Sequence, residues 1–573
     1  MAPRRTLVFL AIGIGLLASL LRFTRLGADG LWVDEAYTVG LVTRSSSEIT
    51  EQLRQDDAPP LFYLLEKAAL SLFGRGEAAA RLLPALLGTA LAVGVALWLA
   101  RRDLSLGVCA GILVAVDPML VFYSRQGRSY ALLHLLSIAL VWLALRLHAK
   151  PTRLAALGFA AVASAILSTH NLGLWTVLAG GLAILPLVRS PGARAPVVIA
   201  LGLTSVAVAG WLVPLLGQLG VHRELNPWMG LFWESRPLAL GPLLSLAAFT
   251  PGAGSLTASQ IGLPGLDRSW QGIGPVLWTA AAIGIAGAFL RPKDLDAQRL
   301  AYTLSLFVAI PLLGLVATSV MIGPAYVVGR TDTLALAPFI VLLALGSAAW
   351  TRTTTGAARV VALLALALAL VLPGLSASLS LLSPQGRLAK GSDRELAAWL
   401  GTQVRAKDAV VYGPLVRPTL AYYGERGEWL DRIEWFGGFP SQIDLNPAAI
   451  YPTPFDSLDA WREEALRLRE AWDRSGVRDV YVLSVRTTSG APGASPGAWP
   501  VRPAAPPTPR ATLTANEVIY PTSVLLYVLA GLSPLPVLRE YRQDWVAGER
   551  VVIRVRREDW VDPASLRDIE VQP

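Results

Sequence analysis

The feature that most constrains this chain is a succession of long apolar runs separated by short polar loops. A helix that crosses the hydrocarbon core of a bilayer needs roughly 20 mostly apolar residues. By that measure the chain contains about eleven transmembrane helices, and we predict an α-helical polytopic membrane protein. The predicted spans are residues 6–23, 78–100, 104–122, 130–147, 154–170, 172–188, 196–216, 273–290, 300–322, 333–350 and 358–381.

The composition agrees with a membrane protein. Of the 573 residues, 53% are hydrophobic and only 16% are charged, whereas about a quarter of the residues in an ordinary soluble protein are charged. The formal net charge of +9 would suit a nucleic-acid-binding protein only if the basic residues formed one patch. They lie instead in short loops between the apolar runs, so we predict a membrane partner and no nucleic acid.

The basic residues also predict the orientation, because cytoplasmic loops carry an excess of Lys and Arg. With the N-terminus in the cytoplasm, the loops around Arg101, Lys150, Arg194, Arg291 and Arg352 all lie inside. We therefore expect a multi-pass protein of the plasma (inner) membrane with its tail on the extracytoplasmic side. The remaining outer segments are residues 24–77, 123–129, 169–171, 217–272 and 323–332.

One apolar stretch, residues 59–74, is not counted as a span. It has only sixteen residues and carries Glu66 and Lys67 at its centre. Such a segment is too short and too charged to cross the bilayer, and it fits a helix that lies in the interface or packs on the bundle. Counting it as a span would place every basic loop outside.

The composition changes at Ser383, which divides the chain into a membrane domain at 1–382 and a soluble domain at 383–573. Charge rises there, and helical and strand periodicities alternate, so we predict a small α/β domain. Residues 488–512 are rich in Pro, Ala and Gly and are predicted to be a loop or disordered insert. The expected elements are helices at 391–405 and 456–475 and strands at 409–413, 480–485 and 551–555.

The first outer segment holds the most suggestive polar residues. Asp34 and Glu35 are adjacent, just beyond the first span. A carboxylate shielded from water at a membrane boundary can act as a general base; alternatively, the pair caps or solvates an interfacial helix. Residues 45–48 have the pattern of a capping box. Asp56 and Asp57 precede two prolines and could line a site or cap a turn.

Arginines and a histidine stand at other outer helix ends. Arg125 and Arg128 occur in the segment YSRQGRSY, and Arg330 occurs in AYVVGRTDT. Because the positive-inside rule disfavours arginine there, a compensating anion is expected. A phosphate matches the guanidinium bidentately, and a carboxylate within the fold, such as Asp34 or Asp117, is the alternative. His170 could be a base or a metal ligand, or simply polar.

The order of these motifs resembles the GT-C superfamily of membrane glycosyltransferases. The similar groups are bacterial relatives of dolichyl-phosphate-mannose protein mannosyltransferases and aminoarabinose lipid A transferases. The resemblance is dense over residues 20–135, thin to about residue 350 and absent from the tail. It rests on W-x-D-E-A at 32–36, D-x-P-P-L-x-Y-L-L at 57–65, L-F-G-x-x-E-x-x-x-R-L-x-P-A-L at 72–86, Y-S-R-Q-G-R-S-Y at 123–130 and G-R-x-x-x-x-A-L-A-P at 329–338.

The resemblance implies an inverting transfer of a sugar from a polyprenyl-phosphate donor to an acceptor hydroxyl of a lipid, glycan or protein. It implies that Asp34 is the general base and that Glu35 orients it or contacts the acceptor. Residues 45–55 and 59–74 would form part of the acceptor cleft. The residues expected around the donor phosphate are Arg128 and Arg330, helped by Arg125 and Tyr130; those expected on the acceptor side are Asp56, Asp57 and His170.

Two positions depart from the family pattern, which usually has His before the paired prolines and often Glu two residues before the arginine. Here the residues are Ala58 and Gln126, which indicates a different acceptor, independence of metal, or lost activity. No cofactor is implied, although Asp34, Asp56 or Asp57 with His170 could hold a divalent metal. The alternative functions are a transporter or flippase of a lipid-linked sugar, or a non-catalytic scaffold. Spans nearly free of charge disfavour transport.

Overall fold

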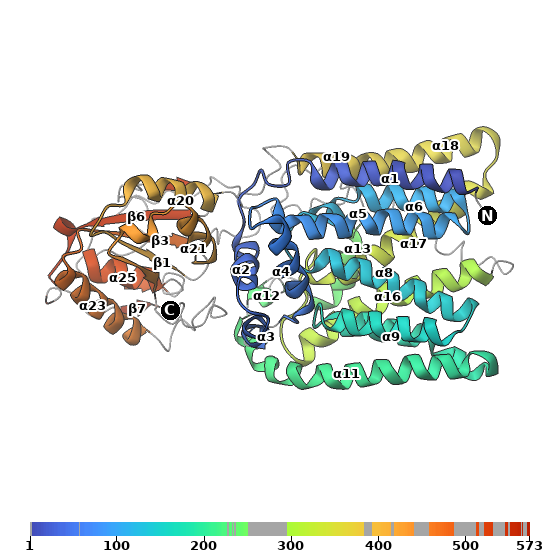
Figure 1. The fold of residues 1–573 in the computed structure, drawn as a ribbon, viewed down its shortest axis with the longest axis horizontal. Helices are drawn as coiled ribbons and strands as arrows, with labels where there is room; N and C mark the ends of the chain where they lie inside the picture. The colour runs from blue at the N-terminus through green and yellow to red at the C-terminus, as the bar shows by residue number, and fades with distance from the viewer. Residues whose placement is uncertain are drawn as a thin grey trace. The chain divides into compact units, whose positions relative to one another are not determined.

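The computed structural model (Figure 1) describes most of the chain. The predicted span at 273–290, Asp57 and residues 488–511 of the predicted insert lie outside the described residues. Those described are residues 3–572 except 55, 57, 226–227, 232, 234–236, 250–294, 383–391, 414–416, 440–457, 486–511, 515–520, 531–544, 548–549, 563 and 565–569.

The membrane domain is a bundle of apolar helices. Within the described residues, six helices are long and apolar enough to cross a bilayer, and a bent pair makes a seventh. The six are α1 (Arg4–Phe23), α5 (Ala79–Ala100), α8 (Tyr130–Ala149), α11 (Pro191–Leu225), α16 (Leu295–Met321) and the continuous Thr331–Ala349, which combines η4 (Thr331–Ala335) with most of α17 (Leu336–Thr353).

Shorter apolar helices occupy the other predicted spans. Residues 154–170 correspond to α9 (Arg153–Leu167), and residues 172–188 to α10 (Gly173–Ile184) with η1 (Leu185–Arg189). The last predicted span is α18 (Gly356–Leu366) followed without a break by a π-helical turn, η5 (Ala367–Val371), and by α19 (Leu372–Ser380). Every predicted span within the described residues is therefore helical.

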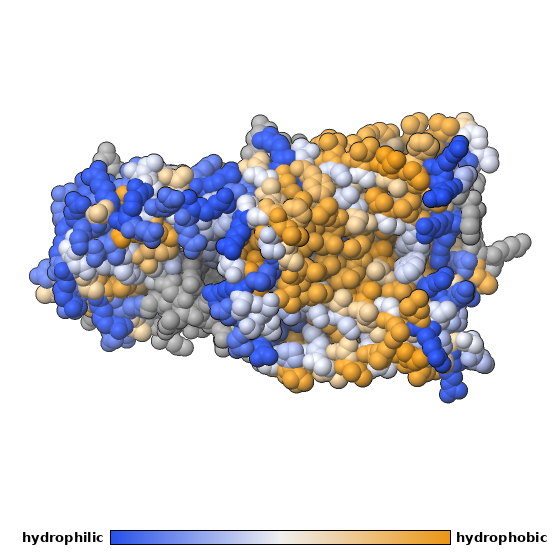
Figure 2. Space-filling view, in the orientation of Figure 1, coloured by the Kyte–Doolittle hydropathy of each residue, from blue (hydrophilic) through white to orange (hydrophobic). Residues whose placement is uncertain are grey.

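The surface of the bundle is apolar, as expected for a protein surrounded by lipid. Figure 2 shows a broad apolar surface over the helices, bordered by hydrophilic residues at the helix ends. Phe9 on α1, Val206 on α11 and Val320 on α16 are 72%, 70% and 72% exposed. Soluble proteins rarely expose contiguous apolar area of this extent, so these side chains face the hydrocarbon of a membrane.

The predicted span at 104–122 is bent rather than straight. It consists of α6 (Leu104–Val116) and α7 (Pro118–Ser124), which meet at 58°. Asp117 between them is extended, and its carboxylate accepts a hydrogen bond from the Leu120 amide at 2.8 Å. The residue before a proline is driven out of the α conformation, so the Asp-Pro dipeptide ends one helix and caps the next.

The stretch left out of the span count forms α4 (Leu61–Phe73). At about 1.5 Å per residue, its 13 residues cover about 20 Å, less than the ~30 Å hydrocarbon core. Lys67 donates hydrogen bonds to the carbonyls of Val42, at 3.2 Å, and Arg44. The two carbonyls lie at and just after the end of α2 (Val33–Val42), where a cation is favourable.

The C-terminal domain is a five-stranded mixed sheet in the order β2-β1-β3-β6-β5. The first three strands are parallel, and β6 is antiparallel to both its neighbours. The strands are β1 (Ala409–Tyr412), β2 (Trp435–Gly438), β3 (Asp479–Val485), β5 (Trp545–Ala547) and β6 (Arg550–Arg556); a second, parallel pair joins β4 (Thr512–Thr514) to β7 (Glu570–Gln572).

Helices accompany this sheet and close its core. They are α20 (Ser392–Gln403), α21 (Arg417–Arg426), α23 (Leu458–Ser475) and α25 (Pro521–Ala530). Trp461 and Trp472 of α23 are each 2% exposed and pack with strand residues such as Val480. The predicted α/β class is confirmed, together with the helices and strands expected at 391–405, 409–413, 456–475, 480–485 and 551–555.

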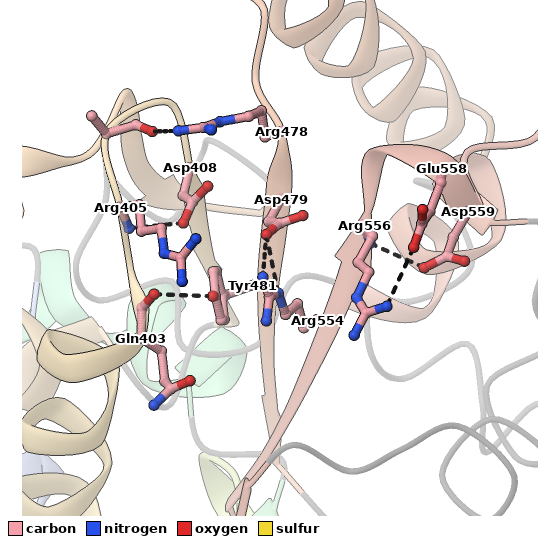
Figure 3. A network of polar contacts seen from close by, with 11 residues as sticks. Gln403, Arg405, Asp408, Arg478, Asp479, Tyr481, Arg554, Arg556, Glu558 and Asp559 are labelled. Carbon is pink, nitrogen blue, oxygen red and sulfur yellow. Dashed lines mark hydrogen bonds and ion pairs between the residues drawn. The ribbon is translucent and has the colours of Figure 1, made fainter.

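Polar contacts hold one end of this sheet together (Figure 3). Asp479 of β3 forms an ion pair with Arg554 of β6, with contacts of 3.1 and 2.5 Å. Asp408, just before β1, accepts a hydrogen bond from the Arg405 amide at 2.8 Å. Because Asp408 is buried, its pKa is raised above the ordinary value of 3.8.

The chain divides into two compact units. One unit contains residues 1–29 and 41–388, and the other contains 389–573 together with Gly30–Gly40. The segment that carries Asp34 and Glu35 therefore belongs, by its contacts, with the C-terminal domain. The sequence analysis assigned it to the membrane domain because the chain there is continuous with the first span.

Candidate functional site

The acid pair lies in the first turn of α2. Glu35 is buried, and its carboxylate accepts a hydrogen bond of 3.4 Å from the amide of Trp32, the residue before the helix. This is the reach-back half of a capping box. Asp34 is half-buried, and its carbonyl accepts a hydrogen bond from the Thr38 hydroxyl at 2.8 Å. Glu35 therefore supports the helix start, and the Asp34 carboxyl is the more accessible of the two.

The predicted capping box at residues 45–48 is confirmed at the start of α3 (Ser46–Arg54). The Ser45 amide donates to the Glu48 carboxylate at 2.8 Å, and the Glu48 amide donates to the Ser45 hydroxyl at 3.3 Å. These bonds hold the pKa of Glu48 below its ordinary value. Ile49 and Leu53 are buried, so α3 packs through the predicted apolar face.

The hairpin tip between α9 and α10 is tied to α3 and α4. The Asn171 amide donates to the Gln218 side chain at 3.1 Å, and Gln218 donates to the Leu53 carbonyl at 2.7 Å. The Leu61 amide at the start of α4 donates to the Ser168 carbonyl at 2.8 Å. These contacts bring the predicted acceptor-side residue His170 into the same region as the α3–α4 connection, which includes Asp56.

The turn between α7 and α8 carries Arg128 and Tyr130. Arg128 is half-buried, and its guanidinium donates to the Tyr63 hydroxyl of α4 at 3.3 Å. The ring of Tyr130 lies 6.4 Å from the His170 ring and 4.4 Å from the Tyr123 ring, measured between centroids. The Arg128 guanidinium therefore contacts α4, and Tyr130, two residues later, lies near the predicted acceptor-side residue His170.

Arg330 is joined to the same region through Tyr123. The Tyr123 hydroxyl donates to the carbonyl of Gly329. The Arg330 amide donates to the Val327 carbonyl at 3.1 Å, and its own carbonyl accepts from the Thr333 hydroxyl at 2.8 Å. The backbone that presents this half-buried arginine is thus fixed on both sides.

Tyr326 supports the loop before Arg330. It is buried, its hydroxyl is hydrogen-bonded to Ser245 at 2.8 Å, and its carbonyl accepts from the Trp233 indole at 2.6 Å. Burial raises the pKa of its phenol well above the ordinary value. Tyr326 therefore remains a neutral packing residue at physiological pH.

Arg125 has a different environment from Arg128. Its guanidinium donates to the carbonyls of Leu21, Arg22 and Thr24 at 3.2, 2.8 and 2.9 Å. These carbonyls end α1, where helix geometry leaves them without intrahelical partners. Backbone carbonyls at the end of α1 thus receive the Arg125 guanidinium. Its role as a helper at the donor phosphate stays a prediction.

Comparison with known proteins identifies the fold. No family model and no curated protein matches the chain. The crystal structure of ArnT from Cupriavidus metallidurans in the apo state matches with a TM-score of 0.50 and 14% identity, covering 96% of this chain and 97% of that one. The chain has an ArnT-like fold. The structure of the same ArnT bound to undecaprenyl phosphate aligns with a TM-score of 0.49, 14% identity and the same coverage.

The ArnT-like fold confirms the predicted architecture, a polytopic helical membrane protein with a C-terminal α/β domain. The likeness extends over the C-terminal domain as well as the helical bundle, because nearly the whole of both chains is aligned. The sequence resemblance had ended near residue 350, so the tail belongs to a shared architecture that its own motifs did not reveal.

The structure adds three polar residues that the sequence analysis did not select. Tyr63 contacts Arg128, as described above. Asp332, two residues after Arg330, is 0% exposed, and the Ser245 hydroxyl and the amides of Gly329 and Arg330 lie near its carboxylate. His134 of α8 is buried near Tyr123, with ring centroids 6.3 Å apart. Tyr63 stands in the motif at 57–65, whereas no local pattern marks Asp332 or His134.

A metal centre was the open alternative. Within the part of the chain that the structure describes, no group of three or more His, Cys, Asp or Glu residues comes together in a way that could hold an ion. Asp57 lies outside that part. Independence of metal therefore stays a prediction.

Proposed function

We propose that this protein is an inverting glycosyltransferase that moves a sugar from a polyprenyl-phosphate donor to an acceptor hydroxyl. The ArnT-like fold supports a lipid-linked sugar transferase in general. The observation that carries the proposal is the half-buried Arg128, whose guanidinium donates to the Tyr63 hydroxyl in a lipid-facing bundle. A cation fixed beside lipid is suited to a phosphate that is itself attached to lipid.

In the proposed reaction, Asp34 takes the proton from the acceptor hydroxyl as its oxygen attacks the anomeric carbon. The new glycosidic bond forms as the bond between that carbon and the phosphate oxygen breaks, which inverts the anomeric configuration. Polyprenyl phosphate leaves with one additional negative charge. Arg128 and Arg330 stabilise that charge, so catalysis rests on one base and on electrostatic stabilisation of the leaving group.

The proposal places the reaction on the extracytoplasmic face of the plasma membrane, with the N-terminus in the cytoplasm. The support is the positive-inside pattern of the loops. Impermeant thiol labelling of single cysteines introduced into intact cells would test this orientation. Cysteine at Arg75 should react from outside and cysteine at Arg102 should not, in a background where Cys109 is replaced by Ser.

The test of function uses purified protein in detergent with radiolabelled polyprenyl-phosphate sugars. We expect the wild type to release sugar slowly to water or to transfer it to a co-purified acceptor, and Asp34→Asn to do neither. The matched control is Asp296→Asn, which removes an exposed carboxylate that forms an ion pair with Arg299, one turn along its helix.

Full activity of Asp34→Asn would contradict the assignment of the base. Absence of both turnover and binding for every such donor would contradict the transferase itself. Uptake of a labelled solute into proteoliposomes would then favour a transporter, and donor binding that is independent of Arg128 would favour a scaffold.

A further inference from the structure

A buried hydrogen bond connects the segment before the acid pair to the C-terminal domain. The amide of Leu31 donates to the hydroxyl of Tyr423 at 2.6 Å, between residues 392 positions apart. Both residues belong to the compact unit that joins Gly30–Gly40 with the C-terminal domain. Leu31 is 0% exposed and Tyr423 is 8% exposed, so water does not compete for this bond.

Tyr423 is itself held firmly. It lies on α21, which is fastened to α20 by a buried hydrogen bond of 2.6 Å from the Thr419 hydroxyl to the Asp393 carboxylate. Its carbonyl accepts from the Gly427 amide at 2.9 Å, which closes the turn after the helix. The phenol is therefore presented from a fixed point of the domain.

The bond acts directly at the entrance to α2. The Leu31 amide is received by Tyr423, and the next amide along the chain, that of Trp32, is received by Glu35. Two successive backbone donors are thereby fixed immediately before the helix whose second residue is Asp34. The start of α2 is held by its own capping residue on one side and by the C-terminal domain on the other.

We propose that Tyr423 is a positioning residue for the general base, through which the C-terminal domain holds Asp34 in its working orientation. This inference rests on the proposed transferase function. By this proposal, the C-terminal domain affects catalysis by positioning the base, and none of the residues of the tail takes part in the chemical step. A buried amide left without a partner is costly, so loss of the phenol should release the segment from the domain.

The test compares Tyr423→Phe with Tyr422→Phe in the full-length protein in lipid nanodiscs. The two substitutions remove the same hydroxyl from neighbouring positions of α21. The Tyr422 hydroxyl accepts a hydrogen bond from Arg426 within α21 itself, and the Arg426 guanidinium lies 5.2 Å from the ring centroid. Tyr422→Phe is therefore a matched control that leaves the Leu31 amide paired.

Two measurements are made on each variant. Amide hydrogen exchange over Gly30–Gly40 should be faster in Tyr423→Phe by roughly tenfold and unchanged in Tyr422→Phe. With a labelled polyprenyl-phosphate sugar, kcat of Tyr423→Phe should fall by roughly tenfold while KM for the donor stays constant, since a displaced base affects the chemical step rather than donor binding. Exchange of β1 and β3 amides reports that the domain remains folded.

Unchanged exchange over Gly30–Gly40 in Tyr423→Phe would overturn the proposal, because the phenol would then not hold the segment. Faster exchange with an unchanged kcat would also overturn it, because the contact would then be structural only. A wild type that neither turns over nor binds any such donor would instead contradict the proposed function. In that case the exchange measurement would still decide whether Tyr423 anchors the segment.

Discussion

The start of α2 carries two acidic residues close together, and the turn between α7 and α8 carries two arginines. In each pair, the two side chains have different surroundings. At the start of α2, Glu35 is buried as a cap and Asp34 is more accessible. In the turn between α7 and α8, Arg125 closes the end of α1 and Arg128 is presented beside a phenol. In each pair, one side chain binds backbone groups and so stabilises the segment that carries the other.

The two pairs differ in the sequence separation between the residue that binds the backbone and the backbone groups that it contacts. Glu35 contacts an amide three residues before it, whereas Arg125 contacts carbonyls that precede it by more than a hundred residues. Loss of Glu35 should therefore loosen one helix start, and loss of Arg125 should weaken the packing between α1 and α7. Paired charges in a motif cannot be assumed to share a role, and their partners show which of them is available for chemistry.

The largest expected effect separates the members of the acid pair. Asp34→Asn should lower kcat by about 10²–10⁴-fold, which is the usual contribution of a general base. Glu35→Gln should lower it by less than about tenfold, because the Gln carbonyl can still accept from the Trp32 amide. Single-turnover kinetics with a labelled donor would measure both. Equal losses in the two variants would break the comparison.

The next effect concerns the accessible arginine. Arg128→Ala should lower kcat by about 10²-fold, because a cation beside the developing phosphate charge is lost, and should leave the thermal midpoint unchanged. Arg128→Lys should recover only part of the activity, since an ammonium lacks the bidentate fork. Arg54→Ala is the control, because Arg54 is exposed and forms an ion pair with Glu51, which is exposed too. A large fall in the thermal midpoint of Arg128→Ala would show that Arg128, like Arg125, has a structural role.

A smaller effect, on stability, is expected for Arg125→Ala. Removal of the guanidinium leaves three carbonyls at the end of α1 without their donor. We expect a loss of about 2 kcal/mol in the free energy of unfolding, with donor affinity of the folded protein preserved. Thermal unfolding in nanodiscs and donor binding would measure the two quantities. Weakened donor binding at constant stability would show instead that Arg125 belongs to the phosphate site.

The smallest effect tests a carboxylate that is structural in the C-terminal domain. Burial raises the pKa of Asp408 above 3.8, so the folded state binds its proton more tightly than the unfolded state. Its contribution to stability is therefore present below pH 3.8 and is lost as the pH rises through the raised pKa. Protection factors of β1 amides, which compare the observed exchange rate with the intrinsic rate at the same pH, should decrease over that window in the full-length protein. Asp408→Asn should flatten this dependence, and an unaltered pH profile would contradict it.

Much of the architecture followed from local patterns. Apolar runs predicted the helices of the bundle, the SSSE pattern predicted the cap of α3, and alternating patterns predicted β1 and β3. The bend between α6 and α7 could have been inferred from Asp117–Pro118, because proline restricts the residue before it. Residues 104–122 were treated as a single span because hydropathy alone does not register that restriction.

The partners of the charged residues could not be predicted in the same way. Arg125 contacts backbone carbonyls, and Tyr423 contacts a backbone amide. Because almost every residue has such backbone groups, the sequence does not indicate which of them will be contacted. The buried Asp332 looked like an ordinary polar loop residue between two threonines. Its burial depends on how η4 packs in the bundle, which involves helices far away in the chain.

The break between α6 and α7 also has a consequence for biosynthesis. Val114 and Ala115 near the end of α6 offer their carbonyls to the fully buried Arg22 of α1 at 3.1 and 2.9 Å. Arg22 is synthesised 93 residues before Ala115, so at ordinary translation rates it waits roughly 5–20 s for these partners. An arginine near the end of a lone helix keeps its charge in water by extending its side chain to the interface. Arg22 should therefore become buried only after α6 has been inserted beside α1.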